Sequence, residues 1–287
     1  MDKANGRLPP ERQYSKQGAG GAIAKHHHGA RRSGVIPTMV SRPVMGRLAH
    51  HPEGGFIPLN GAELEFFHSV AGDRDPPERH VRELWCVVGR RDGKDSVASV
   101  IAAYAAAMFT GQKHLRPGER GLVMCLACDR DQSRIVLNYT RSYFHDMLEA
   151  LTGRNTAIGF ELKNGVDVAV ATNSFRSVRG RPIVCAIFDE VAFWRDETSS
   201  KPDEETLKAI MPALASIPGS IVIGISSPYR KSGLLYKKYK QHFGRNGDVL
   251  VIKAPTSCRP GARGRSRRSE GRMARRVSRR HRQLAGV

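Results

Sequence analysis

The chain has 287 residues, enough for one large or two ordinary domains, and its 40% hydrophobic content suffices for a buried core. The formal net charge of +20 is concentrated at the ends: residues 1–50 carry +7 and residues 259–287 carry +10, which leaves +3 for the rest. No apolar run approaches the roughly 20 residues that span a bilayer, and no N-terminal segment resembles a secretory signal. These features argue against a membrane or secreted protein, and we expect a soluble protein of the cytoplasm.

The two cationic ends differ from the middle of the chain in composition. Residues 1–50 are rich in Gly, His and Arg and are expected to form a flexible basic leader. Residues 257–287 are rich in Arg, Gly and Ser and are expected to be disordered. Two interpretations of this tail stay open: an arm that neutralises nucleic-acid phosphates, or the product of a frameshift or truncation. Residues 51–256 are expected to form the folded domain.

Strands and helices are predicted to alternate along this middle segment. A short helix is expected over 60–70, and a hairpin over 158–172 with its turn at Lys163-Asn164-Gly165. The predicted strands cover 83–88, 121–127, 183–189, 220–226 and 249–253, and the predicted helices cover 94–109, 131–151, 203–215 and 232–243. The strands are continuous apolar runs, as in strands buried on both faces. The sequence therefore predicts a three-layer α/β fold with a mostly parallel sheet.

A Gly- and Arg-rich turn joins the first strand to the first long helix, with the sequence Gly89-Arg90-Arg91-Asp92-Gly93-Lys94. Backbone N–H groups of such a loop, a helix N-terminus and a lysine together suit a polyphosphate. Two positions depart from the usual pattern, because Val88 stands where a Gly is expected and Asp95 where a Ser or Thr is expected. Taken alone, the stretch is also consistent with an ordinary basic turn.

Acidic and hydroxyl side chains follow two later core strands. Asp189-Glu190 ends the strand predicted at 183–189, where a carboxylate can serve Mg²⁺ and a second one can activate water. Ser226-Ser227 ends the next strand and is a candidate for sensing the nucleotide state. An arginine-rich loop, 175–181, precedes the Asp-Glu strand, and its arginines could stabilise transition-state charge in cis or from a neighbouring subunit.

In this order the motifs resemble those of the large terminase subunit of tailed bacteriophages, the motor that packages DNA into proheads. The resemblance covers roughly 55–254 and rests on the deviant loop 89–94, on residues 127–132 after the second core strand, and on the Arg179 loop. It also rests on Ile187 to Trp194 with its central Asp189-Glu190, and on 225–229 followed by 232–236. The Arg-rich loop that lacks one Gly is characteristic of these motors.

The resemblance implies a RecA-like P-loop ATPase of the ASCE type that uses ATP and Mg²⁺. It implies that Lys94 holds the β- and γ-phosphates, Asp189 serves Mg²⁺, Glu190 activates water and Arg179 is the arginine finger, with Arg90 or Arg91 as rivals. Metal ligation beside the loop stays open between Asp95 and Ser96. The expected nucleotide-binding set is Gly89, Arg90, Arg91, Gly93, Lys94, Asp95 and Ser96, and the expected coupling pair is Ser226 and Ser227.

Family members usually also carry a nuclease domain with a cluster of metal-binding carboxylates. Residues 259–287 contain a single acidic residue, Glu270, so no nuclease activity is expected of this chain. The implied partners are double-stranded DNA, a portal, a small terminase subunit and further copies of the chain in a ring. Two other functions remain open: another ATP-driven nucleic-acid translocase, and a truncated, inactive remnant that binds nucleic acid passively.

Overall fold

A single mostly parallel sheet forms the centre of the protein. The computed structural model describes residues 59–90, 93–147, 149–172, 180–195 and 201–254. Within these residues eight strands lie in the order β3-β4-β5-β2-β6-β7-β1-β8. Their bounds are β1 Glu83–Val88, β2 Gly121–Ala127, β3 Thr152–Thr156, β4 Gly159–Leu162, β5 Val166–Thr172, β6 Ile183–Asp189, β7 Ile221–Ser226 and β8 Val249–Ala254. From β5 to β8 all neighbours are parallel, whereas β4 pairs antiparallel with both β3 and β5.

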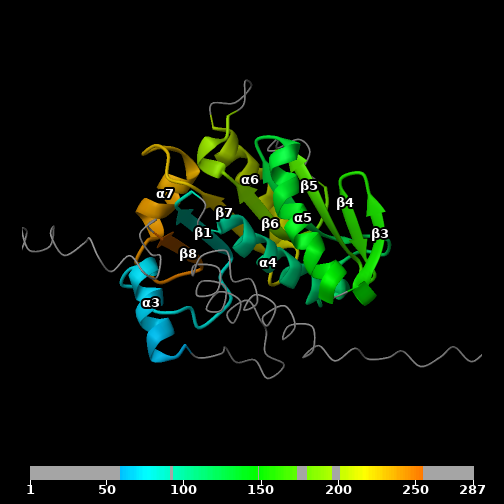
Figure 1. Cartoon of the computed structure of the whole chain (residues 1–287), viewed down its shortest axis with the longest axis horizontal. Helices are drawn as coiled ribbons and strands as arrows, with labels where there is room; N and C mark the ends of the chain where they lie inside the picture. Colours follow the sequence, from blue (N-terminus) through cyan, green and yellow to red (C-terminus); the bar gives the residue numbers. More distant parts are fainter. Residues whose placement is uncertain (1–58, 91–92, 148, 173–179, 196–200, 255–287) are drawn as a thin grey trace, which may run out of the picture.

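Helices cover both faces of the sheet and complete three layers (Figure 1). The core divides accordingly, because α3, α4 and α5 supply buried residues to one hydrophobic cluster and α6 and α7 supply them to the other. The bounds are α3 Gly61–Ala71, α4 Lys94–Ala107, α5 Arg130–Met147, α6 Pro202–Ala215 and α7 Gly233–His242, with 3-10 turns η1 Gln112–His114, η2 Glu149–Leu151 and η3 Val191–Phe193. No helix among the described residues is long and apolar enough to cross a membrane.

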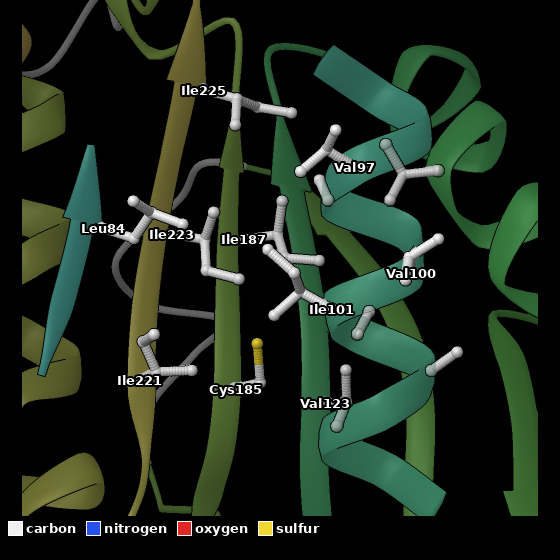
Figure 2. Packing of buried hydrophobic residues seen from close by; sticks show 14 of the residues in the cluster. Leu84, Val97, Val100, Ile101, Val123, Cys185, Ile187, Ile221, Ile223 and Ile225 are labelled. Carbon is white, nitrogen blue, oxygen red and sulfur yellow. The ribbon is translucent and has the colours of Figure 1, made fainter. Parts of the chain in front are cut away.

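The α4 side of the core shows why the strands read as unbroken apolar runs. Val97 and Ile101 of α4 pack on side chains from several neighbouring strands, including Ile187 and Ile223 (Figure 2). Alternate residues of the strands face the opposite layer. Trp85 of β1 and Val222 of β7, for example, belong to the hydrophobic cluster beneath α6 and α7. A strand with both faces buried needs apolar residues at every position.

The predicted three-layer α/β fold is confirmed, and two local expectations need correction. The helix expected over 131–151 ends at Met147, and η2 leads into β3, a strand that the sequence did not predict. Most of β3 is exposed, and its sequence Thr-Gly-Arg-Asn-Thr has no apolar alternation. The hairpin expected over 158–172 is present as β4 and β5, joined through Gly165 at a φ of 85°.

The order of the strands brings three loops together at one edge of the sheet. β7 lies between β6 and β1, and all three are parallel, so their carboxyl ends meet. In the register Asp189 is level with Ile225, and Val87 is level with Ser226. The loop after β1, the acidic pair after β6 and the serine pair after β7 are therefore neighbours, at the edge where open α/β sheets bind ligands.

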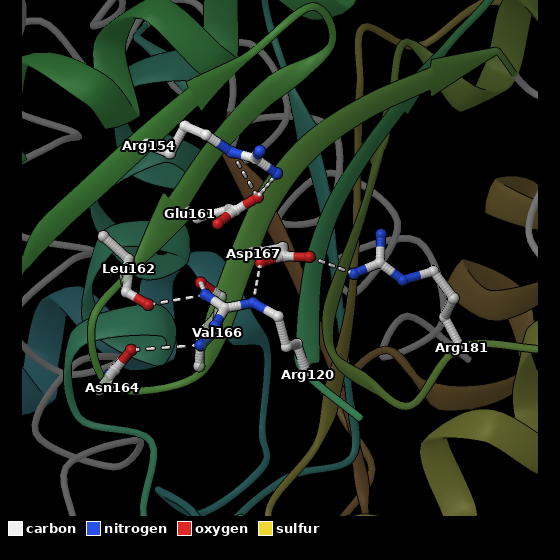
Figure 3. A network of polar contacts seen from close by, with 8 residues as sticks. All are labelled: Arg120, Arg154, Glu161, Leu162, Asn164, Val166, Asp167 and Arg181. Carbon is white, nitrogen blue, oxygen red and sulfur yellow. Dashed lines mark hydrogen bonds and ion pairs between the residues drawn. The ribbon is translucent and has the colours of Figure 1, made fainter. Parts of the chain in front are cut away.

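At the opposite edge, where the parallel strands begin, a network of arginines surrounds Asp167 (Figure 3). The Arg120 guanidinium donates from Nε to Asp167 Oδ1 at 2.6 Å and from Nη2 to the carbonyl of Leu162 at 2.7 Å. The other oxygen of Asp167 accepts a hydrogen bond from Arg181 Nη2. These contacts fix the chain just before β2 and just before β6 to the start of β5.

Candidate nucleotide-binding site

The loop after β1 ends in a helix N-terminus that lacks a side-chain cap. Gly93 is the N-cap of α4, with a φ of 79° and a ψ of 19°, and it makes no side-chain capping bond. This left-handed conformation favours glycine, because a Cβ would clash with the following carbonyl. The first N–H groups of α4 and the helix dipole are thus left for an anion.

Lys94, the first residue of α4, gathers three carboxylates around its ammonium. Its Nζ lies 2.7 Å from Asp95 Oδ1, 3.1 Å from Glu190 Oε1 and 3.7 Å from Asp189 Oδ1. Burial lowers the pKa of Lys94, but the hydrogen bond to Asp95 and the three negative charges outweigh it and raise that pKa above its usual value. Lys94 is therefore charged at neutral pH and ready to attract phosphate.

Asp189 ends β6 and is almost completely buried, with 2% of its surface exposed. Burial raises the pKa of its carboxyl group to about 7; the Lys94 ammonium opposes this shift, and the charges of Asp95 and Glu190 add to it. Its Oδ1 atom is buried without any hydrogen-bond partner. The Trp194 indole donates to the Asp189 backbone carbonyl at 2.8 Å and holds the strand end in place.

Glu190 has a strained backbone and a carboxylate held from two sides. Its φ of 47° and ψ of 40° make it the one non-glycine residue with positive φ in the described part of the chain. Such a conformation costs about 1–3 kcal/mol and is typical of functional sites. Its Oε2 accepts hydrogen bonds from Ser226 Oγ at 3.0 Å and from the Ser227 backbone N–H at 3.2 Å.

An aromatic and arginine cluster, which the sequence motifs did not predict, lies beside these loops. The rings of Phe193 and Tyr229 stack with centroids 4.5 Å apart, which joins η3 to the loop after β7. Arg230 lies over the Tyr229 ring at 4.8 Å, and Arg195 donates to the Tyr229 hydroxyl at 3.2 Å. Both rings follow strand ends by a few residues in the sequence, but stacking depends on the loop geometry.

The structure thus brings together most of the expected site residues that it describes. Lys94, Asp95, Asp189 and Glu190 form one ionic cluster, and both Ser226 and Ser227 contact Glu190. Gly89 and the exposed Arg90 lie in the loop before α4, and Ser96 lies in the first turn of that helix. Arg91 and Arg179, the rival arginine fingers, lie outside the described residues.

A divalent cation, which the resemblance implies, fits the donor groups at this edge. Asp189 Oδ1 and Ser227 Oγ are both buried oxygen atoms without hydrogen-bond partners, and such atoms call for a ligand. Oxygen donors are those that Mg²⁺ prefers. Among the described residues no group of three or more His, Cys, Asp or Glu side chains is placed to hold a metal. The fit is therefore to Mg²⁺ completed by water and phosphate oxygens.

Known proteins resemble this chain in structure but not in sequence. No family model and no curated protein matches the sequence. Among solved structures, the chain is similar to the large terminase ATPase domain of Thermus phage P74-26, with 19% identity, a TM-score of 0.46, and 74% of this chain and 91% of that chain covered. The large terminase of bacteriophage HK97 is similar at 17% identity and a TM-score of 0.48, with 83% of this chain and 51% of that chain covered.

A yeast protein structure is also similar. Dbp5 of S. cerevisiae, bound to Gle1 and IP6, has 11% identity and a TM-score of 0.43, with 82% of this chain and 50% of that chain covered. The chain spans about half the length of this structure and of the HK97 terminase. At these identities and with TM-scores below 0.5, the similarities assign no activity to this chain.

Proposed function

We propose that residues 51–256 are the ATP-hydrolysing motor domain of a phage or prophage DNA-packaging terminase. The observation that carries the ATPase proposal is the convergence of Lys94, Asp189 and Glu190 at one sheet edge, with Glu190 held by the loop after β7. A point charge for phosphate, a buried carboxylate for a cation and a second carboxylate for water are the parts that nucleotide hydrolysis needs. The terminase part of the proposal is supported by the order of the sequence motifs.

The triphosphate of ATP would bind between the loop 89–93 and the N-terminus of α4. Uncapped N–H groups supply hydrogen bonds there, and Lys94 supplies the charge. The Lys94 ammonium now contacts Glu190 Oε1 and would exchange that contact for phosphate oxygens. Glu190 would keep its hydrogen bonds to Ser226 and Ser227, so its other oxygen would be released on the phosphate side.

Glu190 is then placed to accept a proton from a water molecule that attacks the γ-phosphate. General-base catalysis of this kind contributes typically 10²–10⁴-fold. Asp189, with Asp95 or Ser96 on the loop side, would hold Mg²⁺, which neutralises charge that develops on the phosphate oxygens. The Phe193–Tyr229 stack links the segment after Glu190 to the loop after β7 and would couple changes at the carboxylate to the surface.

Arg179 would act as an arginine finger on a neighbouring copy of the chain. Arg181, two residues further on, is bound to Asp167 at the sheet edge opposite Glu190. Two residues of chain span at most about 7 Å, whereas the length of β6 is about 20 Å. This limit favours action between subunits, in keeping with a homo-oligomeric ring on a portal, assisted by a small terminase subunit. Double-stranded DNA is the proposed track, attracted by the cationic ends of the chain.

The test is steady-state ATP hydrolysis by the full chain with Mg²⁺ and double-stranded DNA. Lys94→Ala should abolish turnover, because it removes the positive charge that binds the phosphates. Glu190→Gln should lower turnover about 10²–10⁴-fold. Exposed positions supply the matched controls Lys113→Ala and Glu65→Gln, which should leave turnover unchanged. Turnover that survives both site variants contradicts the proposal. Stimulation by single strands and not by duplex would favour another translocase over a packaging motor.

A further inference from the structure

Asp95 occupies a position that is chemically unusual for a phosphate-binding loop. It directly follows Lys94 in the first turn of α4, where a Ser or Thr hydroxyl is expected. The structure keeps Asp95 on the site side of the helix, because its Oδ1 hydrogen-bonds the Lys94 ammonium at 2.7 Å. Two-thirds of its side chain is buried there.

A second carboxylate turns an oxygen that has no hydrogen-bond partner towards the same ammonium. Asp189 Oδ1 lies 3.7 Å from Lys94 Nζ, its side chain is 97% buried, and this oxygen has no hydrogen-bond partner. The Ser227 hydroxyl after β7 is likewise buried and unpartnered. A buried, unpartnered carboxylate oxygen is costly unless something binds it.

The charges around Lys94 do not balance. Three carboxylates, those of Asp95, Asp189 and Glu190, surround one ammonium, which leaves two negative charges uncompensated when all are ionised. This excess equals the charge of one divalent cation. It grows further when Lys94 turns towards phosphate.

We propose that Asp95 is a direct ligand of the divalent cation, and that Asp95 and Asp189 form a two-carboxylate site that binds Mg²⁺ or Mn²⁺ before any nucleotide. The inference rests on the proposed function, since it assigns the metal ligands of the same site. Ser96 is the rival, but Asp95 is the residue whose carboxylate contacts the Lys94 ammonium, which also lies 3.7 Å from Asp189 Oδ1. Oε2 of Glu190 accepts hydrogen bonds from the serine pair, and its Oε1 is the oxygen proposed to act on water.

Two protein carboxylates match the coordination habit of Mg²⁺, which keeps several waters and takes one or two carboxylates plus phosphate oxygens. An ordinary loop with a hydroxyl in place of Asp95 offers one carboxylate fewer. The predicted consequence is that metal binding no longer depends on the nucleotide. A site of this kind would be loaded with cation first and would then capture free ATP.

The experiment is a titration of the full chain with Mn²⁺ in the absence of nucleotide, followed by the electron paramagnetic resonance signal of free Mn²⁺. Wild type should bind one Mn²⁺ at the site, and Asp95→Ser should weaken this binding at least tenfold, which equals about 1.4 kcal/mol. Asp95→Asn and Asp189→Asn should weaken it similarly. The matched control is Asp131→Ser, because Asp131 lies in the first turn of α5 and its side chain is 88% exposed.

Circular dichroism of each variant establishes that it is folded. Mn²⁺ binding that is equal in wild type and in folded Asp95→Ser overturns the inference, as does a wild type that binds ATP with Mg²⁺ but no Mn²⁺ alone. Both of these results leave the proposed ATPase function standing. Mn²⁺ binding that Asp95→Ser abolishes, in a protein that binds no ATP, supports the metal site and contradicts the ATPase proposal.

Discussion

Replacing Asp189 by Asn should stabilise the protein, and more strongly at alkaline than at acidic pH. The wild-type carboxylate is buried, and its pKa is raised to about 7 from an ordinary value of 3.8. A raised carboxyl pKa means that the folded protein binds the proton more tightly than the unfolded chain does. The contribution of Asp189 to the free energy of unfolding is therefore fully present below about pH 4, and it is lost as the pH rises to about 7.

The magnitude follows from the size of the shift. One pKa unit corresponds to about 1.4 kcal/mol, so ionising Asp189 costs the fold roughly 4 kcal/mol in total. Part of this cost is already present at pH 5, and roughly 2–3 kcal/mol of it develops between pH 5 and pH 8. Asn has nearly the same shape and is neutral throughout, so the variant escapes this loss.

The assay is urea unfolding of wild type and Asp189→Asn at pH 5 and pH 8, with EDTA and without nucleotide. The stability difference in favour of Asp189→Asn should be roughly 2–3 kcal/mol larger at pH 8. The control is Asp131→Asn, because the Asp131 side chain is 88% exposed and its replacement removes no buried carboxylate. A stability difference for Asp189→Asn that is the same at both pH values would show that burial does not raise the pKa of Asp189.

Three further results are expected. Ser226→Ala removes a hydrogen bond to the carboxylate of Glu190, the proposed general base. Such a bond is worth about 1.5–3 kcal/mol for a charged acceptor, so kcat for ATP should fall about 10–100-fold with KM little changed. An unchanged kcat would show that Ser226 does not position Glu190. A Cβ at Gly224 would lie 2.1 Å from the Trp85 ring, so Gly224→Ala should cost about 1–3 kcal/mol in thermal unfolding. Gly61→Ala, with open space around it, should cost nothing, and equal stabilities of the two variants would contradict the packing. Deleting 259–287 should reduce the salt dependence of DNA binding by several units of slope, whereas an unchanged slope would show the segment to be inert.

The core of the fold could be predicted from sequence because burial on both faces leaves a strong signal. β2, β6 and β7 are apolar at nearly every position, so their existence and parallel pairing follow from hydrophobicity alone. β3 could not be predicted, because it is an exposed strand that pairs through its backbone with β4. Backbone pairing of this kind leaves no hydrophobic pattern.

The candidate site was likewise predictable from sequence only in part. Parallel strand ends meet at one edge, so the order of the motifs was enough to place Lys94, Asp189 and Glu190 near one another. The left-handed backbone of Glu190 and its bonds to Ser226 and Ser227 depend on loop conformation. They could not be predicted, because residue type alone does not determine how two loops approach each other.

The most direct test of the proposed nucleotide site is an equilibrium titration of ATP with Mg²⁺ against wild type, Lys94→Ala and the control Lys113→Ala. Lys94 lies at the centre of the ionic cluster, and its ammonium is the group proposed to hold the phosphates. Wild type and Lys113→Ala should bind ATP with the same affinity, and Lys94→Ala should bind it at least tenfold more weakly. Equal affinities of wild type and Lys94→Ala, or no binding to wild type, would contradict the assignment of this sheet edge as a nucleotide site.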